Sequence, residues 1–256
     1  MDIVVLIKFV PDLVEDLEID SSTRLLDRSF LRLMPNELDD HALEEALLLK
    51  ERHGGKVTVL TLDSGDVDET LFTAVAKGAD RVIKITGDGL DQGVSCQRIA
   101  AILEQALADI PCDLILTGTQ AVDDLDGFVG ALLADRMGLP YVGYVTKVIA
   151  AEGTFVAQKE YPGGLNAEIE VNGRAVLGIQ AAEKPPRYVV TSKVMEAMKK
   201  AKVDEIGAGD VPAGDEIPVS AMALPESGAH AEMIEGGVAQ VAEKLIKILR
   251  DRGAIA

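Results

Sequence analysis

The residues best placed to do chemistry lie in one acidic turn between an expected strand and an expected helix. Residues 118–130 read GTQAVDDLDGFVG, after the apolar run 114–116 and before a periodic Ala-Leu-Leu-Ala segment. A small-residue turn from a strand into a helix is where α/β folds bind nucleotides. Because Asp123, Asp124 and Asp126 make the turn acidic, a phosphate held here must rely mainly on backbone N–H groups and the helix dipole. A purely structural turn has a similar sequence, so both interpretations stay open.

The sequence contains none of the common catalytic motifs. It has no Gly-x-Ser-x-Gly elbow, no Walker lysine, no His pair at metal spacing and no GxGxxG after the first expected strand. His41, His53 and His230 are typical of ordinary polar positions. Glu44 and Glu45 are neighbours that do not share a helical face, which makes them poor acid/base partners. We therefore expect a binding protein with no catalytic residues and no metal site.

Composition and charge argue against several classes of partner. The 256 residues carry 43 acidic and 25 basic side chains, a net charge of −18. Nucleic acids and anionic membranes are bound mainly by Lys and Arg, so neither is an expected ligand. Cys96 and Cys112 have no CxxC spacing and read as free thiols of a reducing compartment. With no basic leader and no apolar run of bilayer length, we expect a cytoplasmic protein that does not insert into membranes.

Strand and helix patterns alternate along the first half of the chain. Apolar runs predict strands over residues 3–9, 57–62, 81–85 and 114–117. One helical pattern follows Asn36, which stands at an N-cap position, and others predict helices over residues 66–77 and 97–108. The polar residues 15–28 predict a short excursion, such as a hairpin. Strands separated by helices of about a dozen residues imply βαβ crossovers, and hence a doubly wound, mostly parallel, Rossmann-like α/β sheet.

The second half of the chain has a different pattern of secondary structure. Residues 141–149, 154–160, 166–171 and 175–179 read as strands joined by Gly-containing turns, which predicts an antiparallel addition to the sheet. Residues 207–230 are rich in Gly, Pro and Ala and read as an arm. A final helix, predicted over residues 232–252, places apolar side chains near one face: Ile234, Val238, Val241, Leu245, Ile248 and Leu249. We therefore expect a nucleotide-binding domain at residues 1–206 and a C-terminal arm and docking helix at residues 207–256.

Several segments, in the right order, resemble the β subunit of electron-transfer flavoprotein. The first strand and turn read MDIVVLIKFVPD. The family's Asn-Pro-x-Asp-x-x-Ala-Leu-Glu-Glu-Ala helix and second strand are matched by NELDDHALEEALLLKERHGGKVTVLTL, and its Ala-x-Gly-Ala-Asp-Arg turn by AVAKGADRVIKI. Its Gly-Lys-Gln-Ala-Ile-Asp loop is similar to GTQAVDDLDGFVG, and two later family segments are similar to KEYPGGLNAEIEV and EKPPRYV. The match spans about residues 1–202. Several motifs in the same order as in the family are more specific evidence than any single motif.

The resemblance implies one subunit of an obligate heterodimer. An α subunit would hold most of a redox-active FAD, and this β subunit would close over it. Electrons would come from flavin dehydrogenases of the acyl-CoA dehydrogenase type and leave toward a membrane quinone oxidoreductase. The β subunit would also hold AMP with a structural role, or a second FAD in electron-bifurcating members. Carried over to matching positions, the contacts are Leu6, Asn36, Asp39, Gln120, Ala121, Val122, Asp123, Asp124, Val129 and Gly130.

Departures from the family pattern bear on the ligand. Glu37 replaces a proline and Thr119 a lysine, while Leu125 and Phe128 replace an acid and a glutamine of the phosphate turn. The pattern of the bifurcating members is kept at only three positions of this turn, which favours AMP over a second FAD. Losing the lysine from an acidic turn is expected to weaken phosphate binding by about 1 kcal/mol if that contact was charge-assisted.

The family's dehydrogenase-docking loop aligns with residues 189–200. Thr191 stands where the family has its anchoring leucine, and the basic tail Lys199-Lys200-Ala201-Lys202 is kept. Either the dehydrogenase partner differs, or the anchor lies at Val190 or Val194. The alternative to a docking role is that residues 193–202 simply form a solvent-exposed helix. The arm and last helix resemble the extension by which the β subunit reaches the α subunit.

Two other classes of protein stay open. One is an adenine-nucleotide-binding stress or sensor module of the same general fold, which acts without an α subunit or flavin. The other is an enzyme of the nucleotide α-hydrolase kind, and the lack of basic residues near 118–130 argues against it. An α-subunit reading frame beside this one would favour the electron carrier.

Overall fold

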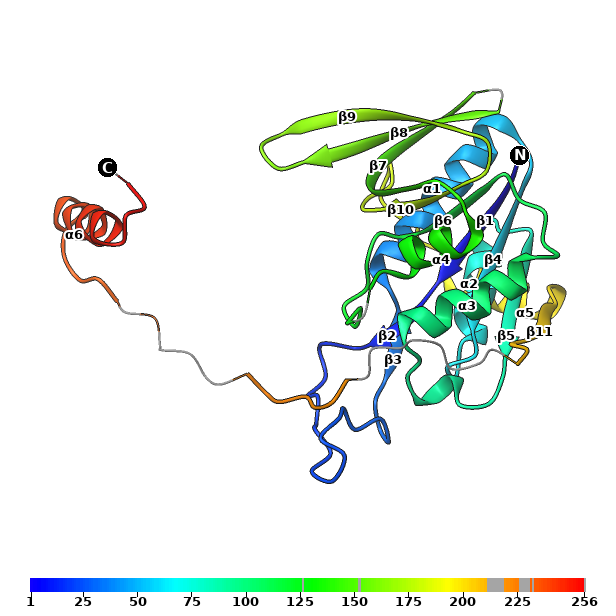
Figure 1. Ribbon diagram of the computed structural model, residues 1–256, viewed down its shortest axis with the longest axis horizontal. Helices are drawn as coiled ribbons and strands as arrows, with labels where there is room; N and C mark the ends of the chain where they lie inside the picture. The colour runs from blue at the N-terminus through cyan, green and yellow to red at the C-terminus, as the bar shows by residue number, and fades with distance from the viewer. Residues whose placement is uncertain (126, 152, 211–218, 226–230, 232, 256) are drawn as a thin grey trace. The chain divides into compact units, whose positions relative to one another are not determined.

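The computed structural model describes residues 1–255 except residues 126, 152, 211–218, 226–230 and 232, and the side chain of residue 92 (Figure 1). The chain divides into two compact units, Met1–Met222 and Ala223–Ala256. The domain boundary that the sequence suggests after residue 206 stays a prediction. None of the helices in the described residues has the length and apolar character that a membrane crossing requires.

The first unit is built on one large β-sheet. Within the part of the chain that the structure describes, nine strands pair in the order β11-β5-β4-β1-β6-β10-β7-β8-β9. Their bounds are β1 (Asp2–Ile7), β4 (Lys56–Leu62), β5 (Arg81–Thr86), β6 (Leu114–Gly118), β7 (Tyr141–Ala151), β8 (Thr154–Tyr161), β9 (Leu165–Asn172), β10 (Ala175–Ile179) and β11 (Val203–Gly207). Two short strands, β2 (Phe9–Pro11) and β3 (Leu33–Pro35), form a separate antiparallel pair. They bracket the excursion of residues 12–32, in which one antiparallel bridge joins Ile19 and Leu26.

The seven strands from β11 to β7 run parallel to one another, whereas β8 pairs antiparallel with β7 and β9 pairs antiparallel with β8. The expected mostly parallel α/β sheet with an antiparallel addition is confirmed. The assignment of residues 175–179 to that addition is wrong, because β10 lies between β6 and β7 and runs parallel to both. All five β10 residues are buried, as expected for a central strand of a parallel sheet.

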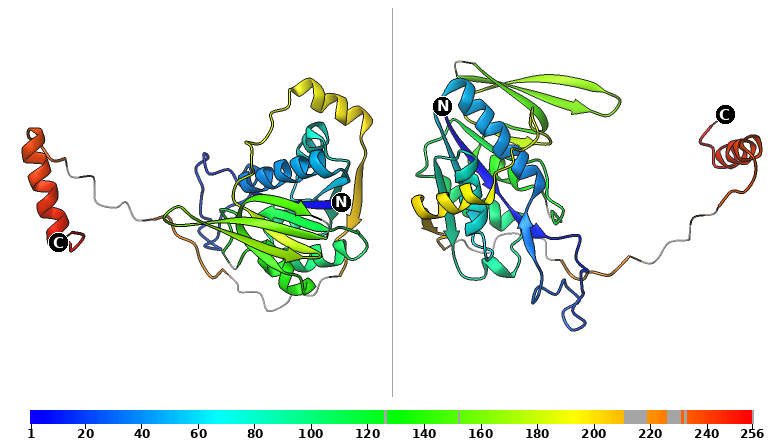
Figure 2. Two further views of the ribbon diagram at one scale, coloured as in Figure 1. Left: turned by 90° about the horizontal axis from the view of Figure 1, so that it is seen from above. Right: turned by 180° about the vertical axis from the view of Figure 1, so that it is seen from behind.

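Helices cover both faces of the sheet. Their bounds are α1 (Glu37–His53), α2 (Asp68–Lys77), α3 (Cys96–Leu107), α4 (Val129–Met137) and α5 (Thr191–Lys200). Successive strand residues point to opposite faces, so Val5 packs in the core that includes Leu47 of α1, and Val4 in the core that includes Leu103 of α3. Figure 1 shows α3 and α4 in front of the sheet, and Figure 2, from behind, shows α1 on the other face.

The strand order reverses beside β1. The chain places β4 on one side of β1 and β6 on the other, both parallel to it. In open α/β sheets, ligands bind outside the carboxyl ends of the strands at such a switch point. The residues that follow β1 and β6 are therefore the first place to look for a site.

The second unit carries α6 (Val238–Asp251). The expected start of this helix near residue 232 is wrong, and residue 232 itself lies outside the described residues. The helix begins after Gly236 and Gly237, because glycine is a poor helix former. No residue of α6 is buried, and its large apolar side chains include Val238, Leu245, Ile246, Ile248 and Leu249. The expected arm falls partly on residues 211–218 and 226–230, outside the described chain.

Candidate nucleotide-binding site

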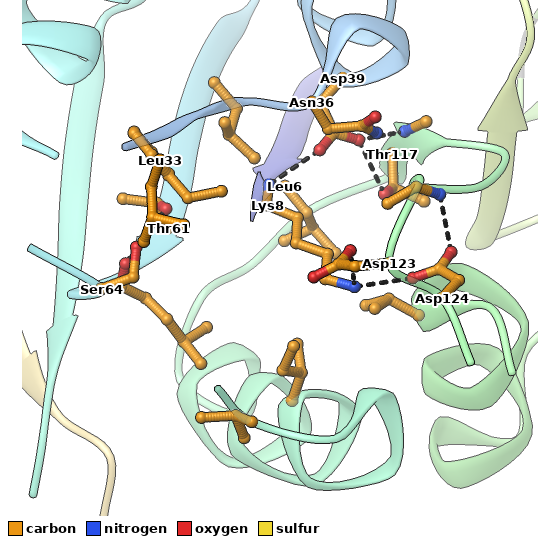
Figure 3. Close-up of a pocket in the computed structure, with 18 of the residues that line it drawn as sticks. Leu6, Lys8, Leu33, Asn36, Asp39, Thr61, Ser64, Thr117, Asp123 and Asp124 are labelled. Atoms are coloured by element: carbon orange, nitrogen blue, oxygen red, sulfur yellow. Dashed lines mark hydrogen bonds and ion pairs between the residues drawn. The ribbon is translucent and has the colours of Figure 1, made fainter. Parts of the chain in front are cut away.

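A cavity opens at the switch point, at the carboxyl ends of β1, β4 and β6 (Figure 3). Its lining surrounds about 780 Å³ of space, which includes open solvent at the mouth. Eight of the ten predicted contact residues line it: Leu6, Asn36, Asp39, Gln120, Ala121, Asp123, Asp124 and Val129. The other two do not line it, since Val122 is 57% exposed and Gly130 is buried at the start of α4. Ligand contact by any of the ten stays a prediction.

Asp39, in the first turn of α1, is a buried carboxylate that joins the ends of β1 and β6. Its Oδ2 accepts a hydrogen bond from the backbone N–H of Lys8 at 2.8 Å. Its Oδ1 accepts from the backbone N–H of Gly118 at 2.5 Å and from the Thr117 hydroxyl at 3.3 Å. Burial raises the pKa of Asp39 to about 6, although these hydrogen bonds oppose the rise. Asp39 therefore fixes the spacing of the two strand ends that border the cavity.

Asn36 stands at the N-cap position of α1, but its side chain makes no capping hydrogen bond. Instead, its Nδ2 donates to the carbonyl oxygen of Gln120 at 3.0 Å. Its backbone N–H donates to the carbonyl of Lys8 at 2.8 Å. The predicted N-cap position of Asn36 is confirmed, but its amide holds the turn that follows β6 and does not cap the helix.

Lys8 is the site residue that sequence interpretation missed. Its Nζ lies 2.8 Å from Asp123 Oδ1 and 2.7 Å from Asp124 Oδ1 (Figure 3). Burial opposes the charge of Lys8, but the two carboxylates raise its pKa well above the usual value. The acidic turn thus has an internal counter-ion. The sequence feature that could have identified Lys8 is its position directly after the buried strand β1, at the edge of the sheet where parallel strands end.

The Asp124 side chain accepts a hydrogen bond from a backbone N–H of its own turn. Its Oδ2 accepts from the N–H of Ala121 at 2.7 Å, and its Oδ1 accepts from the Cys96 thiol at 3.1 Å. A carboxylate at a backbone N–H of this turn takes a place where a phosphate oxygen is expected. The third acid of the turn, Asp126, lies outside the described residues.

Two glycines allow helices to start close to β6. A Cβ added at Gly118 would lie 2.7 Å from Leu38 Cβ, and one added at Gly130 would lie 2.6 Å from Thr117 Cγ2. Between them, Thr119 is buried, and its hydroxyl oxygen accepts from the backbone N–H of residue 144 at 3.0 Å. A small residue that braces β7 therefore stands where the resemblance places a lysine.

The chain matches a known family over most of its length. A family model described as Electron transfer flavoprotein domain matches residues 27–211. An electron transfer flavoprotein subunit beta from Methylophilus methylotrophus is 32% identical over 262 residues, which cover 98% of each chain. This chain belongs to the electron transfer flavoprotein β-subunit family. Membership in this family supports an electron-transfer role that involves a flavin.

Other subunit beta proteins of the electron transfer flavoprotein family are similar along the chain. The protein from Thermoanaerobacterium thermosaccharolyticum is 29% identical over 263 residues, which cover 100% of each chain. The protein from Clostridium acetobutylicum is 32% identical over 203 residues, 78% of this chain and 76% of the relative.

The segment before the expected docking loop of the family is held on α1 by buried acids. Glu45 is fully buried and accepts from the backbone N–H of Glu183 at 3.0 Å. Glu44 accepts from the backbone N–H of Arg187 at 3.0 Å, and its Oε1 contacts the Arg187 guanidinium at 2.9 Å. His41 is half-buried and accepts from the backbone N–H of residue 182 through Nδ1 at 3.2 Å. These three side chains hold segment 182–187 in place, a role that their positions in the sequence did not suggest. His53 is exposed, and the third histidine, residue 230, lies outside the described chain.

Proposed function

We propose that this chain is the β subunit of a heterodimeric electron-transfer flavoprotein. The α subunit holds most of the FAD, which supplies the redox chemistry when bound. Electrons reach the complex from flavin dehydrogenases of the acyl-CoA dehydrogenase type and leave toward a membrane quinone oxidoreductase. What supports this proposal is the similarity to a subunit beta over 98% of the chain. The proposed location is the cytoplasm, in keeping with two free thiols, Cys96 and Cys112.

AMP with a structural role is the proposed ligand of the cavity. An adenine ring needs apolar walls, and these side chains supply them: Leu6, Leu60, Leu62, Leu90, Val94 and Leu103. A polar atom of the ligand can pair with the buried Ser64 hydroxyl, which has no hydrogen-bond partner among the described residues. Asn36 and Asp39 keep the turn after β6 in position. The chain's own part is therefore to bind and to order the subunit, without a chemical step.

The proposed dehydrogenase contact lies at residues 189–200, on and before α5. Large side chains in this range are exposed, Met195 by 54% and Met198 by 50%, and the neighbouring Tyr188 is exposed by 85%. Val190 is 47% exposed, whereas Val194 is half-buried. Exposed aromatic and methionine side chains are enriched at protein interfaces. Val190 is therefore the better candidate for the anchor that the family's leucine provides.

The proposed contact with the α subunit is made by the arm and α6. The exposed apolar residues of α6 include Leu245 and Leu249, exposed by 45% and 41%. An amphipathic helix with no buried residue gains stability by docking its apolar face on a partner. Deletion after residue 207 is expected to weaken heterodimer formation.

Co-expression with the neighbouring α-subunit candidate tests the proposed function. The purified complex is treated with acid, and released FAD and AMP are counted per heterodimer. One FAD with one AMP supports the proposal, and two FAD would indicate an electron-bifurcating subunit instead. AMP bound by this chain alone, without a complex or flavin, would indicate a sensor module, and hydrolysis of added ATP would indicate the enzyme class. No complex and no flavin would refute the proposal.

A further inference from the structure

Lys8 partly neutralises the acids of the turn after β6. Lys8 is paired with both Asp123 and Asp124, so the three side chains together carry one net negative charge. Asp124 also occupies the backbone N–H of Ala121. A nucleotide phosphate placed beside Asp123 and Asp124 would face their carboxylates, and like charges in a partly buried site repel. The cavity therefore needs another cation if it is to bind a phosphate.

A second cation, Arg28, stands in the lining of this cavity. It lies in the excursion of residues 12–32 and lines the same cavity. Among the described residues, Arg28 forms no ion pair and no side-chain hydrogen bond. Its guanidinium packs over Gly93, where an added Cβ would lie 2.6 Å from Arg28 Cζ. The cavity wall thus contains a half-buried guanidinium whose donors are available to a ligand.

A second polar group of the cavity also lacks a partner. Ser64, directly after the loop residue that follows β4, has a buried hydroxyl with no hydrogen bond in the described part of the chain. Figure 3 shows Ser64 and Leu33 across the cavity from Lys8 and the two aspartates. Buried polar atoms are rarely left unpaired, so this hydroxyl indicates a polar ligand atom at the cavity.

The excursion that carries Arg28 is held by its own hydrogen bonds. The N–H of Asp27 donates to the carbonyl of Glu18 at 2.9 Å, and the N–H of Asp12 donates to the carbonyl of Arg32 at 3.0 Å. These contacts fix the backbone on both sides of Arg28. A guanidinium on an ordered backbone loses less freedom when it binds an anion.

We propose that Arg28 is the anion-binding residue of the cavity and that its guanidinium binds the phosphate of an adenine nucleotide. Guanidinium presents a planar fork of N–H donors that matches two phosphate oxygens. This inference rests on the proposed nucleotide-binding function and adds the residue that recognises the phosphate. The lysine absent at position 119 is then replaced by a cation from a different part of the chain.

The test compares AMP with adenosine, which lacks the phosphate. Equilibrium dialysis on the purified heterodimer measures the affinity for labelled AMP and its displacement by adenosine. The variant is Arg28→Gln, and the matched control is Arg32→Gln, on the same excursion but 70% exposed at its side chain and outside this cavity. We expect Arg28→Gln to weaken AMP binding by about ten- to a hundredfold and to change adenosine binding less than about twofold. Arg28→Lys should fall between the variant and the wild type.

Two results would overturn the assignment of Arg28. One is unchanged AMP affinity in Arg28→Gln. The other is an equal loss of AMP and adenosine in a variant with unchanged melting temperature, since Arg28 would then only shape the cavity. If the wild-type heterodimer binds neither AMP nor FAD at this cavity, the nucleotide part of the proposed function fails as well. Wild-type AMP binding that Arg28→Gln leaves intact refutes the assignment of Arg28 alone.

Discussion

Replacing Asp39 with asparagine should remove a measurable part of the pH dependence of folding. Burial raises the pKa of Asp39 from an ordinary 3.8 to about 6 in the folded chain. The folded state therefore holds this proton more tightly than the unfolded state does. Asp39 contributes stability that is fully present below about pH 4 and is lost as the pH rises through 6.

The size of the effect follows from the two pKa values. The difference between 3.8 and about 6 corresponds to about 3 kcal/mol over the whole pH range. At pH 5 the folded carboxyl is mostly protonated and the unfolded one mostly ionised, whereas at pH 7 both are ionised. About 1 kcal/mol of the total therefore falls between pH 5 and pH 7.

Urea unfolding of the wild type and of Asp39→Asn, followed by circular dichroism at both pH values, measures this difference. The free energy of unfolding of the wild type minus that of the variant should fall by about 1 kcal/mol from pH 5 to pH 7. Comparing the two chains cancels the titration of the other acids. A difference that stays constant or rises with pH would refute the reasoning, because the hydrogen bonds from Lys8 and Gly118 would then outweigh burial.

Three further substitutions test the site and the docking segment. Lys8→Met removes the cation paired with the buried Asp124 side chain, so it should lower the free energy of unfolding by about 3 kcal/mol at pH 7, measured by urea unfolding. Gly130→Ala places a Cβ against Thr117, and urea unfolding should detect a loss of about 1–3 kcal/mol. Val190→Ala should slow electron transfer from the dehydrogenase severalfold without changing the melting temperature. Unchanged transfer rates in that variant would show that the anchor lies elsewhere.

The sheet could be predicted because its signals are local. Segments rich in apolar residues mark β1, β4, β5 and β6, and each is separated from the next by a helical pattern or a turn. The place of β10 could not be predicted in the same way. Its sequence AVLGI is apolar throughout, which fits a central strand, but strand order depends on long-range packing that no local pattern reports.

The sequence predicted where the candidate site lies, but it did not predict which charged side chains meet there. The strand-to-helix turn identified the segment around Asp123 and Asp124, and most predicted residues do line the cavity. The counter-ion Lys8 lies 116 positions from Asp124, so nothing local links the two. Arg28 comes from an excursion that composition marks only as polar. The charge balance of the cavity is thus a property of the fold.

One helix connects the cavity to the expected docking segment, which gives the proposed structural role of AMP a physical basis. The N-cap residue Asn36 and the first-turn residue Asp39 of α1 lie at the cavity, and the middle of α1 carries Glu44 and Glu45, which hold residues 187 and 183. A ligand that binds only the folded site stabilises it by RT ln(1 + [L]/Kd). Because local opening of α1 would release both groups of contacts, that stabilisation extends to the segment that leads into α5. AMP can then order a protein-docking surface without taking part in electron transfer.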